Sequence, residues 1–74
     1  MIVGVPKEIK NHEYRVGLTP ESVKRLNAES HSVLVETNAG LGSGFTNQNY
    51  IDAGGRILEN ADELFNASDL IIKV

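Results

Sequence analysis

The chain has 74 residues, of which 41% are hydrophobic, and a formal net charge of −3. This length allows one small domain at most, because short chains bury only about 60% of the surface that they expose when unfolded. Seven scattered Lys and Arg residues argue against a nucleic-acid-binding surface, and the absence of cysteine excludes disulfides and thiolate metal sites.

No apolar run approaches the roughly 20 residues of a membrane span, so we expect a cytoplasmic protein with no membrane partner. The two isolated histidines, His12 and His31, do not predict a metal site. His31 is expected to pack or to form a hydrogen bond in the turn before the second strand.

The first third of the chain contains a strand, a polar segment and a helix start. An apolar run over residues 2–5, ended by a proline, predicts a buried first strand. The polar segment 6–15 follows. Residues 19–21, Thr-Pro-Glu, are typical of a helix start, because they supply a capping oxygen, a ring with helical φ and an acid at the positive end of the helix dipole. We predict a helix over residues 20–28.

The remaining elements alternate in the same way. Helix starts are indicated at Thr46 and at Asn60, which has capping-box spacing to Glu63, and a left-handed residue in the Gly54-Gly55 pair is expected to end the first of these helices. Between and after them we predict strands over residues 33–35, 56–58 and 70–72, a glycine-rich segment over 37–45, and a helix over 47–53.

The alternation predicts an α/β fold: a partial Rossmann-like (flavodoxin-like) βαβαβαβ arrangement with a mostly parallel sheet and helices on its faces. Ligands of such sheets bind beyond the carboxyl ends of the strands, which places residues 6–15 on the ligand side. The last apolar run meets the end of the sequence without a turn or cap. We therefore expect residues 1–74 to be the N-terminal part of a longer protein.

Arg15 is the first candidate binding residue. Its guanidinium forms a planar fork of donors that matches a carboxylate, and it keeps its charge at working pH. Spacing alone favours a surface arginine paired with Glu8 or Glu13. Lys7, Glu8, Lys10 and Glu13 form either an acid–base set or a mutually neutralising surface, and His12 is either a proton shuttle or an exposed histidine.

The segment AGLGSGF, residues 39–45, has part of the dinucleotide-binding fingerprint. Gly40 and Gly42 fit the first two glycines, but Phe45 takes the third position and Gly44 comes one residue early. The pattern therefore favours a conformational role, or close approach to another part of the protein, over cofactor binding.

Three stretches, MIVGVPKEIKNHEYRVGLTPESV, VLVETNAGLGSGFT and ASDLIIKV, resemble the N-terminus of the alanine dehydrogenase family. The resemblance implies an NAD-dependent oxidoreductase that interconverts L-alanine with pyruvate and ammonia. It also implies an N-terminal substrate domain, a separate Rossmann NAD domain and a homo-hexamer. The NAD-binding α-subunit of proton-translocating transhydrogenase shares part of the pattern, and an inert scaffold or oligomerisation fragment is a further alternative.

The resemblance also assigns site residues. The arginine of the family's Asn-Glu-x-Arg motif, which binds the substrate carboxylate, falls on Arg15. The substrate lysine is the second in a Lys-Val-Lys-Glu-Pro motif, of which Lys73 and Val74 supply only the first two residues, so Lys73 does not take that role. The catalytic histidine and aspartate and the NAD-binding domain are expected beyond Val74.

The resemblance thus implies that residues 1–74 are part of the substrate domain and contain no catalytic, cofactor-binding or metal-binding residue. Alone, they are expected to be inactive and to self-associate. Ser30 stands where the family usually has glycine, which would strain a left-handed helix end and leaves the end of the first helix open.

Overall fold

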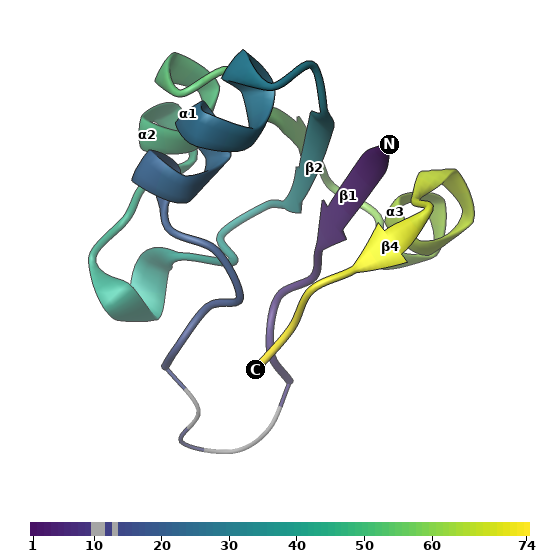
Figure 1. The fold of residues 1–74 in the computed structure, drawn as a ribbon. Coiled ribbons are helices and arrows are strands. Elements are labelled where there is room, and N and C mark those ends of the chain that lie inside the picture. The colour runs from purple at the N-terminus through teal and green to yellow at the C-terminus, as the bar shows by residue number, and fades with distance from the viewer. Residues whose placement is uncertain (10–11, 13) are drawn as a thin grey trace.

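A computed structural model describes residues 1–9, 12 and 14–74. It confirms the predicted α/β fold (Figure 1). The four strands form one sheet in the order β3-β2-β1-β4, and every neighbouring pair is parallel. The strands are β1 (Ile2–Val5), β2 (Ser32–Glu36), β3 (Arg56–Leu58) and β4 (Leu70–Ile71).

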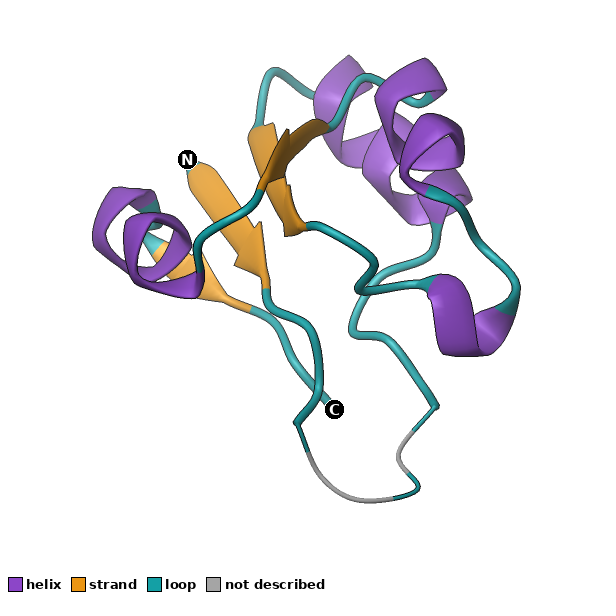
Figure 2. Cartoon of the chain, turned by 180° about the vertical axis from the view of Figure 1, so that it is seen from behind, coloured by secondary structure: helices purple, strands orange, loops and turns teal. Residues whose placement is uncertain are grey.

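The helices lie on both faces of this sheet (Figures 1 and 2). They are α1 (Pro20–Ala28), α2 (Asn47–Asp52) and α3 (Ala61–Ala67). α1 and α2 cover one face and α3 covers the other. This follows from the strand order, because the first two crossovers move along the sheet in one direction and the third returns across it to the far side of β1.

The main core lies between the sheet and the layer of α1 and α2. Side chains two apart on a strand point to the same face, so Val3 and Val5 of β1 join Val33 and Val35 of β2 in one buried cluster. Val23 of α1, Tyr50 of α2 and Ala39 complete it. Leu64 of α3, fully buried, lies on the opposite side of the sheet.

The three helices start at the positions that the sequence predicts, but the two-sided capping box forms at Thr46 and not at Asn60. The Thr19 side chain accepts a hydrogen bond from Ser22 N at the start of α1. Thr46 and Asn49 form a two-sided capping box at α2. Asn60 Oδ1 accepts from the amides of Asp62 and Glu63 at α3, so within the described residues that cap is one-sided.

Ser30 closes the end of α1 in a left-handed conformation, although this residue is not glycine. Ser30 adopts a left-handed conformation with φ of 70°, and the His31 amide donates to Leu26 O at 3.0 Å across it. This is the helix ending that normally uses glycine, as it does at Gly54 after α2, where φ is 96°. His31 is half-buried, and its ring Nδ1 has no hydrogen-bond partner among the described residues.

Candidate functional site

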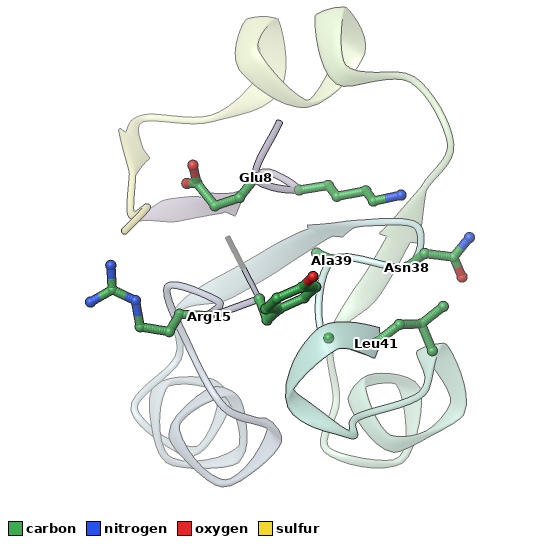
Figure 3. A pocket seen from close by; sticks show the side chains of 8 residues that line it. Glu8, Arg15, Asn38, Ala39 and Leu41 are labelled. Carbon is green, nitrogen blue, oxygen red and sulfur yellow. The ribbon is translucent and has the colours of Figure 1, made fainter. Parts of the chain in front are cut away.

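A cavity of about 270 Å³ lies at the carboxyl ends of β1 and β2 (Figure 3). One side comes from the segment after β1, and the other from the glycine-rich segment after β2. Parallel strands end at the same edge of a sheet, so these two segments meet although about 30 residues separate them. The lining residues are Lys7, Glu8, Tyr14, Arg15, Asn38, Ala39, Leu41 and Gly42.

The segment after β1 is hydrogen-bonded near its start to the end of β2. Lys7 N donates to Glu36 Oε1 at 2.9 Å, which ties the first residues of this segment to the last residue of β2. Glu8, half-buried, follows directly and lines the cavity. Glu36 therefore holds the cavity's two sides together at the sheet, a role that sequence analysis missed.

The glycine-rich segment approaches the backbone just before Arg15. It contains a short 3₁₀ turn, η1 (Leu41–Ser43), and Ser43 Oγ donates to Tyr14 O at 2.8 Å. A Cβ on Gly42 would lie 2.9 Å from Tyr14 Cα and from Tyr14 O. The expected close approach to another part of the protein is confirmed, and its partner is Tyr14.

Arg15 is exposed and lies at the rim of the cavity. Figure 3 shows that its side chain and that of Glu8 extend to the same side, whereas Asn38 and Leu41 extend to the opposite side. The chain after β4 is close to the same region, because Gly17 packs directly against Ile72 O. A guanidinium at this position suits a bidentate contact with a small carboxylate.

Comparison with known proteins identifies the fold's relatives. A family model described as "Alanine dehydrogenase/PNT, N-terminal domain" matches residues 4–74. The chain belongs to this family. Two alanine dehydrogenases, from Bacillus subtilis and Methanococcus maripaludis, are 53% and 49% identical to it over all 74 residues. The chain spans about a fifth of the length of these relatives, 19% and 20% respectively.

Solved structures agree with the family assignment. An L-alanine dehydrogenase matches 99% of this chain with a TM-score of 0.95 and 45% identity, and the matched part is 20% of that protein. A transhydrogenase from Sinorhizobium meliloti matches with a TM-score of 0.89 and 41% identity, over 99% of this chain and 21% of its own. The resemblance to alanine dehydrogenase is thus confirmed at the level of the N-terminal domain.

Gly40 and Gly42, the two glycines that match part of the dinucleotide-binding fingerprint, each have little free space around them. A Cβ on Gly40 would lie 2.6 Å from the Tyr50 hydroxyl, and the equivalent space at Gly42 is filled by Tyr14. Both glycines therefore face the chain's own atoms, whereas the fingerprint needs glycines that face a pyrophosphate at a helix N-terminus.

Two of the remaining charged candidates lie in the same cavity as Arg15. Lys7 and Glu8 share the cavity with Arg15. His12 is exposed, with φ of 61°, and its Nδ1 lies 3.4 Å from the Tyr14 hydroxyl. Lys10 and Glu13 lie outside the described residues. The structure thus brings together two members of the predicted charged set with Arg15.

In the part of the chain that the structure describes, no three His, Cys, Asp or Glu side chains gather where they could hold a metal ion. Among the helices described, none combines the length and apolar character needed to cross a bilayer.

Proposed function

We propose that residues 1–74 are the N-terminal part of the substrate domain of an NAD-dependent L-alanine dehydrogenase. The enzyme would convert L-alanine, NAD and water to pyruvate, ammonia and NADH. Identity of about half over all 74 residues to two alanine dehydrogenases supports this most directly. The resemblance to the family further supports a cytoplasmic homo-hexamer.

Within this enzyme, we propose that Arg15 binds the carboxylate that L-alanine and pyruvate share. Three observations support the assignment. Arg15 lines a cavity at the carboxyl ends of two parallel strands, its guanidinium matches a carboxylate, and the family's arginine motif falls on it. NAD would bind to residues outside 1–74 and supply the hydride acceptor, while this part holds the substrate.

The test is steady-state kinetics of the full-length protein that carries residues 1–74, in both reaction directions. Arg15→Ala removes charge-assisted hydrogen bonds worth about 1.5–3 kcal/mol each, so kcat/KM for alanine and pyruvate should fall on the order of 10- to 1,000-fold. Arg15→Lys should also be impaired, because a lysine cannot form the bidentate contact. Arg25→Ala, which removes an exposed arginine from α1, is the matched control and should change little.

Three outcomes would count against the proposal. Unchanged kcat/KM in Arg15→Ala would exclude the carboxylate contact, and a defect in NAD affinity alone would place Arg15 at another site. Saturable NADH production by residues 1–74 alone would contradict the proposed division of the enzyme, because the hydride acceptor's site lies outside this part.

The transhydrogenase match supports a second candidate. At 41% identity and a TM-score of 0.89, the domain also fits the N-terminal part of a transhydrogenase subunit. Alanine-dependent NADH formation by the full-length protein favours the first candidate. Hydride transfer between NADH and an NADP analogue, without alanine turnover, favours the second.

A further inference from the structure

The structure assigns a positioning role to Gly42 and Ser43: they hold the Tyr14 backbone and thereby set the position of Arg15. This inference rests on the proposed role of Arg15 in substrate binding. Neither residue is expected to touch the substrate.

The contact with Tyr14 is direct and close. Ser43 donates its hydroxyl to the carbonyl of Tyr14 at 2.8 Å, and this carbonyl belongs to the peptide bond that leads into Arg15. Gly42 packs its Cα side against Tyr14 so closely that an added Cβ would be 2.9 Å from Tyr14 Cα and O and 3.0 Å from Tyr14 Cβ. Such distances require the backbone of one segment to move.

The η1 turn is a firm support because it is tied to the core. Phe45 N donates to Gly40 O at 2.9 Å and closes the turn. Gly40 in turn packs against Tyr50, which is 0% exposed and whose hydroxyl donates to Leu18 O at 2.8 Å. Contacts therefore run without interruption from the buried core through η1 to Tyr14.

Arg15 needs such support because it is an exposed residue on a long connection. Between the end of β1 at Val5 and the start of α1 at Pro20, the chain makes no regular secondary structure among the described residues. Anchors along this connection include the Lys7–Glu36 bond near its start, the Ser43–Tyr14 contact, and the Gly17–Ile72 contact and Tyr50–Leu18 bond near its end. Substrate-binding groups must be held to within a fraction of an ångström to be effective.

The experiment uses the full-length protein with three variants at the contact. Gly42→Ala should lower kcat/KM for alanine and pyruvate by about 10- to 100-fold, because it displaces the Tyr14 backbone and Arg15 with it. Ser43→Ala should lower it about three- to tenfold, the usual value of one neutral hydrogen bond. Ser43→Thr keeps the hydroxyl and should restore most of the loss. KM for NAD should be unchanged in all three.

Gly44→Ala is the matched control within the same segment. Gly44 has φ of 87° and open space around its Cβ position, so alanine adds backbone strain at this residue, beyond the Leu41–Ser43 turn, and places no atom near Tyr14. It should lower the melting temperature and leave KM for alanine unchanged. If Gly44→Ala raises KM as much as Gly42→Ala, the effect is general destabilisation and the positioning role is wrong.

Hydrogen exchange of the peptide spanning residues 14–18 separates this inference from the proposed function. Faster exchange in Ser43→Ala than in wild type or Ser43→Thr supports the contact between Ser43 and Tyr14. This result does not depend on enzyme activity. If the exchange is faster but the protein does not oxidise alanine, only the proposed function fails. Wild-type exchange in Ser43→Ala, or an active Gly42→Ala enzyme with unchanged KM for alanine, overturns the positioning role.

Discussion

Ser30 carries a conformational strain that glycine would relieve. Its φ of 70° lies in the left-handed region, where a side chain costs roughly 1–2 kcal/mol. Ser30→Gly removes this cost but adds about 0.4–1 kcal/mol of entropy to the unfolded chain. We therefore expect the free energy of unfolding to rise by about 0.5–1 kcal/mol, as measured by urea denaturation followed by circular dichroism.

The opposite substitution, Gly54→Ser, is the comparison for Ser30→Gly. Gly54 ends α2 in the same way, but an added Cβ would lie 2.6 Å from Asn27 Nδ2. Gly54→Ser should therefore destabilise the chain by more than Ser30→Gly stabilises it. A loss of stability in Ser30→Gly would mean that the left-handed conformation is not what limits this position.

The ionisation of Tyr50 should make the free energy of unfolding depend on pH in the alkaline range. The Tyr50 hydroxyl donates to Leu18 O, and burial raises the pKa of the phenol above its ordinary value of 10.0. Tyr50→Phe should lower the free energy of unfolding by about 1 kcal/mol near pH 7, because the hydrogen bond is lost. The folded state binds the phenol proton more tightly than the unfolded state. The protonated phenol's contribution to the free energy of unfolding is therefore complete below about pH 10. It declines as the pH rises through the pKa that Tyr50 has in the folded state.

The difference between wild type and Tyr50→Phe should thus be constant up to about pH 9 and shrink above about pH 10. Urea denaturation across this range measures it. Other groups titrate at alkaline pH in both proteins, so only the difference is informative. A constant gap up to about pH 11 would show that the Tyr50 proton does not contribute to alkaline unfolding.

At the scale of elements, local signals predict the helices well. The helix starts at Thr19-Pro20, Thr46 and Asn60 depend on residues within one turn of backbone, so the sequence alone reveals them. The two-sided capping box, however, forms at Thr46 and Asn49 and not at Asn60 and Glu63, where the sequence indicated its spacing. The η1 turn has no comparable signal, because its three residues, Leu-Gly-Ser, show no helical periodicity and are ordered by contacts with distant parts of the chain. For the same reason the sequence indicated Arg15 but not the side of the cavity formed by Asn38, Ala39 and Leu41.

The α2 cap has a consequence for the whole core, because α2 presents Tyr50. Thr46 Oγ1 accepts from Asn49 N at 3.1 Å, and Thr46 N donates to Asn49 Oδ1 at 2.8 Å. Thr46→Ala removes the cap and should cost about 1 kcal/mol of stability. Thr46→Ser keeps the hydroxyl and should cost much less, so equal losses in the two variants would attribute the effect to the missing methyl group.

At the scale of the molecule, the strand order is that of the Rossmann fold and not the flavodoxin-like order that the sequence analysis named beside it. Alternating strands and helices predict a doubly wound sheet, but both common orders satisfy that pattern. The observed order, β3-β2-β1-β4, places β4 beside β1 and depends on long-range contacts such as Asp69 N to Ile2 O at 2.7 Å. This order brings Ile72 against Gly17 and so places the chain after β4 near Arg15.

The same strand order leaves apolar surface beside β4. Phe65 of α3 and Leu70 of β4 are 47% and 45% exposed, and β4 pairs on one side only among the described strands. Exposed edges and apolar patches favour association. We expect residues 1–74 alone to self-associate with increasing concentration in sedimentation velocity. Leu70→Lys should weaken association by placing a charge at this edge, whereas Ile51→Lys, on the exposed part of α2, should not. A wild-type chain that stays monomeric at millimolar concentration, or equal effects of both variants, would contradict association through β4.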